Sequence, residues 1–166
     1  MITLEAFNQL NINEAVALLE SCVAIPDWAR QVTARRPYGN RAALLATGQQ
    51  AMTGWQVEEL TLALRAHPRI GEQAGSTSRH ADFSRQEQAA ISTENLSLAA
   101  ALRIGNSRYE DTFGRIFLIR ANDRSGEEIL QILQRRLQNS EQQEIEETLE
   151  QLRQITLLRL EGIIRA

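Results

Sequence analysis

The C-terminal stretch SGEEILQILQRRLQNSEQQEIEETLEQLRQITLLRLEGIIRA, residues 125–166, decides the fold class of this chain. It contains two capping-box spacings, in which a serine is followed three residues later by Glu or Gln: Ser125 with Glu128, and Ser140 with Gln143. Behind the second spacing, apolar and small residues recur at helical intervals at Ile145, Leu149, Leu152, Ile155, Thr156 and Leu160. The stretch therefore predicts two consecutive helices, the second with one apolar face.

Similar helix signals run upstream, with predicted helices over residues 11–22, 26–35, 40–54, 55–66, 84–92 and 93–114. Asn13 and Asn40 are expected N-caps, Pro26 opens a helix in its first turn, and Gly114 closes one. Strand signals are scarce: the apolar run RIFLIRA, residues 115–121, lacks a helical period but stands alone. We predict an all-α fold, a single domain over residues 1–166 with about seven or eight helices. The Glu/Gln-rich run at 141–151 is expected to be a solvated helix face.

The composition excludes several kinds of chemistry. The chain has 166 residues, 43% of them hydrophobic, which suffices for one domain with a substantial core. All 18 basic residues are arginines, so a lysine Schiff base and a P-loop are impossible. With one cysteine, Cys22, and two histidines, one chain cannot form an internal disulfide or a tetrahedral Cys/His zinc site. If the chain is an enzyme, we expect it to work with arginines, carboxylates and a histidine, and without a Cys/His-bound metal.

The charge and the ends of the sequence bear on partners and location. A net charge of −3 gives no attraction to nucleic acid. No apolar run approaches the roughly 18–20 residues that span a bilayer. The N-terminus lacks the pattern of a signal peptide, and the C-terminal GIIRA matches no peroxisomal or retention signal. We expect a cytoplasmic protein that does not bind membranes.

His67 stands in LRAHPRIGEQ, residues 64–73, directly before Pro68 and at the start of a predicted loop over residues 67–83. A residue before proline resists the helical conformation, and a histidine suits a helix C-terminus, so a structural explanation exists. A loop of this length is usually functional or disordered, however. Histidine can accept or donate a proton near neutral pH, which makes His67 a candidate catalytic residue.

Three further candidates have equally ordinary structural explanations. Glu87 lies three residues after Ser84, which predicts a capping box, but a helix N-terminus also attracts anionic ligands. Arg120 and Asn122 follow the apolar run, where extended backbone can bind a small heterocycle or simply connect two helices. Arg159, set among leucines, either extends to solvent or holds a carboxylate or ureido group.

Several segments come in the order and spacing of one family: FNQL at 7–10, WA at 28–29, RRPY at 35–38, HPRIGE at 67–72, SRQEQ at 84–88, YEDTFGRIFLIRA at 109–121, ILQRRLQN at 132–139 and LLRL at 157–160. Over nearly its whole length the sequence resembles the family of 2-oxo-4-hydroxy-4-carboxy-5-ureidoimidazoline (OHCU) decarboxylases of urate catabolism. The resemblance implies an all-α, cofactor-free enzyme that converts OHCU to (S)-allantoin and CO2. Family members tend to dimerise, so a homodimer is an open expectation.

The resemblance also implies a set of site residues. The family's catalytic histidine falls on His67, and Glu87 is expected to bind the ureido group or to orient that histidine. The substrate-binding positions fall on Pro68, Ser84, Arg85, Gln86, Glu87, Gln88, Ile119, Arg120, Ala121, Asn122 and Asp123, and the family's late arginine falls on Arg159. Two alternatives stay open: another ureide-pathway lyase or hydrolase that uses His67, and a helical protein-interaction module.

Overall fold

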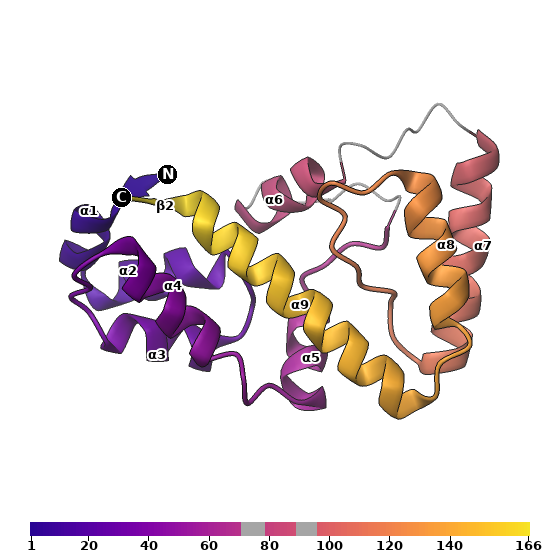
Figure 1. The fold of residues 1–166 in the computed structure, drawn as a ribbon, viewed down its shortest axis with the longest axis horizontal. Coiled ribbons are helices and arrows are strands. Elements are labelled where there is room, and N and C mark those ends of the chain that lie inside the picture. The colour runs from indigo at the N-terminus through magenta and orange to yellow at the C-terminus, as the bar shows by residue number, and fades with distance from the viewer. Residues whose placement is uncertain (71–78, 89–95) are drawn as a thin grey trace. The chain divides into compact units, whose positions relative to one another are not determined.

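In the computed structural model, residues 1–70, 79–88 and 96–166 are described, and these residues contain nine helices and two short strands (Figure 1). The elements are β1 (Ile2–Thr3), α1 (Leu4–Gln9), α2 (Ile12–Glu20), α3 (Pro26–Ala34), α4 (Arg41–Gln50), α5 (Val57–Leu64), α6 (Arg79–Glu87), α7 (Leu96–Phe113), α8 (Gly126–Arg136), α9 (Glu141–Ile163) and β2 (Ile164–Arg165). The all-α prediction is confirmed. The helix that the sequence did not predict is α1, whose N-cap Thr3 accepts a hydrogen bond from the Ala6 amide.

Side-chain caps explain where several helices begin. Ser125 accepts a hydrogen bond from the Glu128 amide at the start of α8, and Asn40 accepts one from the Ala43 amide at the start of α4. Pro26 occupies the first turn of α3, as predicted. The prediction of Asn13 as the cap of α2 is wrong: Asn11 has the extended backbone of a cap and accepts from the Glu14 amide at 2.8 Å. Asn13 lies inside the helix.

The described chain divides into two compact units, and the first comprises residues 1–63 and 153–166. Its core includes the fully buried side chains of Trp28, Leu44 and Leu160. The Trp28 indole N–H donates to the Gly48 carbonyl at 2.9 Å. A Cβ at Gly48 would lie 2.8 Å from Leu160 Cδ2, so glycine permits this close approach. β1 and β2 pair in parallel, with Ile2 opposite Ile164.

The second unit comprises residues 64–152, with α7 and α8 packed side by side (Figure 1). A Cβ at Gly105 would lie 2.5 Å from Leu133 Cδ2, so the two helices approach closely at that glycine. The apolar cluster of this unit consists of Ile70, Leu98, Leu102, Tyr109, Phe113, Phe117, Ile119, Ala121, Ile129 and Leu133. It therefore joins the residues just after His67 to the segment around Ile119.

The division into two compact units does not test the prediction of a single domain over residues 1–166, which stays a prediction. Along α9, the predicted apolar face is confirmed, with Ile145 half-buried and Leu149, Leu152, Ile155, Thr156 and Leu160 buried. The predicted solvated face at 141–151 needs correction at Glu144, which is fully buried. Among the described residues, no helix combines the length and apolar character needed to cross a membrane.

Candidate active site

His67 follows the end of α5, where its amide donates to the Leu64 carbonyl at 3.2 Å. The helix ends before His67 and Pro68, as the sequence predicts. The His67 side chain is half-buried, and its Nε2 atom is buried from solvent. Only the remaining atoms of the imidazole are open to a small molecule in this conformation.

Helix α7 holds the two residues that follow Pro68. The Ile70 side chain is buried, and its carbonyl accepts a hydrogen bond from Asn106 Nδ2 at 2.9 Å. Arg69 makes a bidentate ion pair with Glu110, with its Nη2 2.8 Å from Oε1 and its Nε 3.0 Å from Oε2. Asn106 and Glu110 are one helical turn apart and face the same way. The backbone that carries His67 is thus attached to α7 at two successive residues.

The predicted segment 84–88 lies at the C-terminal end of α6, not at a helix N-terminus. Helix α6 already begins at Arg79, within the predicted loop, and the Ser84 carbonyl accepts from the Gln88 amide at 3.1 Å. The Ser84–Glu87 capping box is therefore wrong, because residues three apart are also neighbours inside a helix. Within α6, Asp82 and Arg85 lie three residues apart and form an ion pair.

Glu87 therefore lies at the end of a helix, where the electrostatic potential differs from that at a helix start. The end of a helix has exposed carbonyls and negative potential, so no helix-terminal amides favour an anion there. Ser84 is buried, Glu87 and Gln88 are half-buried, and Arg85 and Gln86 are exposed. Any contact of this segment with a ligand must come from side chains. The last two residues of HPRIGE and the predicted helical residues 89–92 lie outside the described part of the chain.

Residues 119–123 run without helix or strand and end in a turn, in agreement with the prediction for RIFLIRA. Ile119 and Ala121 are buried in the apolar cluster, whereas Arg120 and Asn122 are half-buried. The Arg120 amide donates to Gln151 Oε1 at 2.9 Å, and the Arg120 guanidinium donates to the Asn122 carbonyl at 3.0 Å. The backbone here is held in one conformation by side chains.

Ile70 and Ile119 belong to the same apolar cluster, so the His67 segment and the segment 119–123 rest on one core. Helix α6 belongs to the same unit. Arg159 belongs to the first unit: it is buried, and its Nη1 donates to the Cys22 carbonyl at 3.1 Å. Arg159 therefore does not extend to solvent, and its contact with a substrate stays a prediction.

The sequence reasoning overlooked a buried polar network in the second unit, centred on Arg136 and Glu144. A periodicity signal was present. Arg136 continues the stripe of Ile129 and Leu133 at helical spacing, which is an unusual position for a charge. Asn106 carried a similar signal, because it lies between Leu102 and Tyr109 at helical spacing, whereas Gln151 carried none.

Comparisons with known proteins assign this arrangement of helices to a family. The family model of OHCU decarboxylase matches residues 8–161. The chain is 27% identical to the uric acid degradation bifunctional protein of a Bacillus species over 99% of its own length, and it spans 33% of that longer protein. It is also 27% identical to the 2-oxo-4-hydroxy-4-carboxy-5-ureidoimidazoline decarboxylase of Haloferax volcanii, covering 96% of this chain and 94% of the relative.

A solved structure agrees with these sequence matches. The crystal structure of an OHCU decarboxylase in the presence of (S)-allantoin superposes with a TM-score of 0.71 and 25% identity, covering 87% of this chain and 94% of that one. The fold is that of a helical urate-degradation decarboxylase. The chain belongs to the OHCU decarboxylase family.

Proposed function

We propose that this chain catalyses the reaction for which its family is named, the decarboxylation of OHCU to (S)-allantoin, with His67 as the proton donor or shuttle. The observation that carries the proposal is the family match over residues 8–161, which includes HPRI at 67–70 and SRQEQ at 84–88. The half-buried imidazole of His67 supports its role.

The chemistry suits a chain without lysine, because OHCU contains its own electron sink. Its carboxylate sits beta to a ring imine. When the bond to CO2 breaks, its electron pair forms a carbon–carbon double bond, and the imine nitrogen takes up a proton, which gives an enamine. A proton then adds to the carbon that bears the ureido group, and the ring hydroxyl loses its proton to become the carbonyl. The protein need only bind the anion, desolvate its carboxylate and deliver the proton to one face.

Each candidate residue has a role in this proposal. His67 acts at the hydroxyl and carboxylate region, and Pro68 restrains the backbone so that the imidazole keeps its direction. Glu87 hydrogen-bonds the ureido N–H groups or orients His67. Ser84 and Gln88 bind polar edges of the substrate through their side chains.

The remaining contact is made by backbone groups. The backbone of residues 119–123 pairs with the imidazolone amide. The ligand in this proposal is a small molecule. Cytoplasmic location and a homodimer stay predictions, to be tested by fractionation and by light scattering.

Coupled turnover from urate tests the reaction and the histidine together. Urate oxidase and hydroxyisourate hydrolase generate OHCU in the cuvette, circular dichroism follows optically active allantoin, and a separate assay follows CO2. We expect wild type to form (S)-allantoin faster than spontaneous decay, and His67→Asn to lose at least about a hundredfold, as for a general acid. Allantoin formation by His67→Asn at the wild-type rate would refute the role of His67.

CO2 release also separates the open alternatives. A hydrolase acting on a related ureide would consume substrate without releasing CO2. An interaction module would accelerate neither signal. Either result from correctly folded wild type would overturn the proposed reaction.

A further inference from the structure

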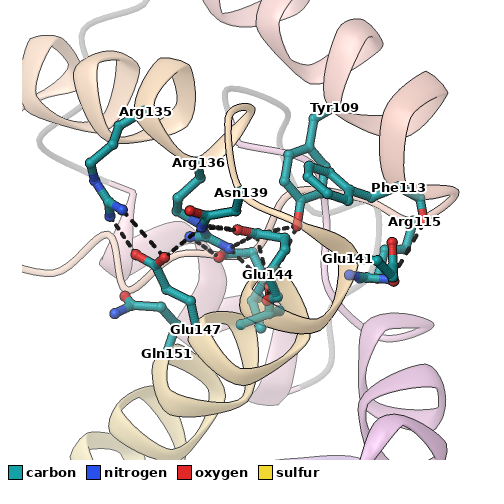
Figure 2. Close-up of polar contacts among 12 residues, drawn as sticks. Tyr109, Phe113, Arg115, Arg135, Arg136, Asn139, Glu141, Glu144, Glu147 and Gln151 are labelled. Carbon is teal, nitrogen blue, oxygen red and sulfur yellow. Dashed lines mark hydrogen bonds and ion pairs between the residues drawn. The ribbon is translucent and has the colours of Figure 1, made fainter.

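Arg136 and Glu144 form a fully buried ion pair in the second unit, with Nη2 and Oε2 2.6 Å apart. Arg136 ends α8 and Glu144 lies in the first turn of α9, and Figure 2 shows the pair within a network of polar side chains. A buried ion pair adds little net stability, because desolvation of the two charges offsets their attraction. In some proteins a buried polar or ionic group instead specifies one conformation of its surroundings.

The carboxylate of Glu144 is fully engaged by its neighbours. Arg136 Nε lies 3.1 Å and 3.0 Å from its two oxygens, Tyr109 donates to Oε2 at 2.5 Å, and Asn139 donates to Oε1 at 3.1 Å. Burial, and then the hydrogen bond to Glu144, raise the pKa of Tyr109 to about 12, so the phenol keeps its proton and stays a donor. Glu144 thereby holds the Arg136 guanidinium in one orientation.

In that orientation one nitrogen of Arg136 reaches a backbone carbonyl of the segment between α7 and α8. Nη1 donates to the Leu118 carbonyl at 2.8 Å. The guanidinium also lies over the Phe117 ring, with Cζ 4.5 Å from the ring centroid. Arg136 thus fixes two successive residues immediately before the segment 119–123.

Gln151 of α9 supplies a second attachment two residues further on. Its Oε1 accepts from the Arg120 amide at 2.9 Å. The Leu118 carbonyl and the Arg120 amide lie on either side of Ile119, whose side chain is 3% exposed and packs in the apolar cluster. The peptide groups around Ile119 are thus held from α8, from α9 and from the core.

We propose that Arg136 and Gln151 are positioning residues that set the backbone of residues 119–123 for substrate binding. The inference rests on the proposed function, because it takes this segment to contact OHCU. Hydrogen bonds weaken steeply when donor and acceptor move out of line, so a displaced segment binds the substrate less tightly. Proton transfer from His67 belongs to a different segment and is largely unaffected.

The double variant Arg136→Met with Glu144→Gln separates positioning from folding. It removes both buried charges and keeps an acceptor for Tyr109, and such neutral replacements are often well tolerated. We expect KM for OHCU to rise about tenfold, the equivalent of one hydrogen bond. We expect kcat to change less than about threefold, with an unchanged pH profile of kcat.

Two single variants complete the test. Gln151→Met removes only the acceptor for the Arg120 amide, from a half-buried position, and should raise KM about threefold to tenfold. Arg135→Met is the matched control, because this neighbour on α8 pairs with Glu147 at the protein surface. Its KM should stay within about twofold of wild type.

The outcomes are distinguishable. If the double variant and Gln151→Met lose thermal stability but bind OHCU with wild-type KM, the network is purely structural and the inference is wrong. If Arg135→Met raises KM as much as the double variant does, the effect is general electrostatics and the inference is also wrong. An inactive wild type would overturn the proposed function, and this inference with it.

Discussion

Asp123 has a backbone φ of 62°, in the left-handed region that side chains other than glycine rarely adopt. It closes the segment 119–123, so the strain lies at the proposed site. We expect Asp123→Gly to keep or raise stability, and Asp123→Val to lower it by about 1–2 kcal/mol and to raise KM. Urea unfolding and steady-state kinetics of the two variants check this. Equal stability of the two variants would show that the left-handed conformation imposes no constraint.

The raised pKa of Tyr109 leads us to expect that the protein is less stable at alkaline pH. Its folded pKa of about 12 lies above the ordinary tyrosine pKa of 10.0, because burial disfavours the phenolate. Between those values the unfolded chain ionises first, so stability that is fully present below about pH 10 falls by up to about 3 kcal/mol as pH rises toward 12. Urea unfolding at about pH 9 and about pH 11 should show this fall in wild type and a smaller one in Tyr109→Phe. Identical falls in the two proteins would contradict the assignment.

At the residue scale, the sequence revealed side chains that are unusual in themselves. His67 was identifiable because histidine is rare here and precedes a proline at a helix end. The contributions of Asn106, Arg136 and Gln151 were missed because each binds a backbone carbonyl or amide far away in the sequence. Every residue has such backbone groups, so a sequence carries no mark of which ones are bound.

At the scale of elements, the same capping-box spacing predicted the start of one helix correctly and the start of another wrongly. At α9 the Ser140 side chain accepts from the Gln143 amide, and Gln143 accepts from the Ser140 amide. At Ser84 the spacing lies inside α6. Serine and glutamate three residues apart meet at a helix start and in a helix interior alike, and only the backbone conformation before the serine decides between them.

The charge pattern predicted a solvated position for Glu144, which is buried. The run 141–151 is polar on average, but Glu144, Thr148 and Leu152 recur at intervals of four on the buried face of α9. The average of a segment says little about one of its faces. The helical class and every described helix except α1 were predictable from the sequence, whereas which charge is buried depends on Arg136 of another helix.

Helix α7 is predicted to keep the His67 backbone in place through Asn106. Asn106→Ala leaves the Ile70 carbonyl without this donor, at a cost of about 1–3 kcal/mol. Because this segment carries His67, we expect kcat for OHCU to fall about tenfold with a smaller change in KM. Ser107→Ala, at an exposed neighbouring position on α7, is the control and should change kcat less than about twofold. A normal kcat in Asn106→Ala would show that this hydrogen bond does not control the position of His67.

At the scale of the whole molecule, a single domain over residues 1–166 would require the two compact units to unfold together. Both tryptophans, Trp28 and Trp55, belong to the first unit, so their fluorescence reports that unit, whereas far-UV circular dichroism reports all helices. Residues 141–152 of α9 belong to the second unit and residues 153–163 to the first. Since one helix contributes to both, we expect the two signals to unfold at the same temperature.

The variant Leu133→Ala tests whether the two units unfold together. Leu133 is fully buried in the second unit, and its truncation should cost about 2–5 kcal/mol. In a single cooperative domain, tryptophan fluorescence then shifts with circular dichroism, by about 5–15 °C, although no tryptophan lies in the altered unit. Leu62→Ala, at a position 42% exposed, is the control and should shift neither signal appreciably. If circular dichroism shifts while fluorescence keeps its wild-type midpoint, the units unfold independently and the single-domain prediction is wrong.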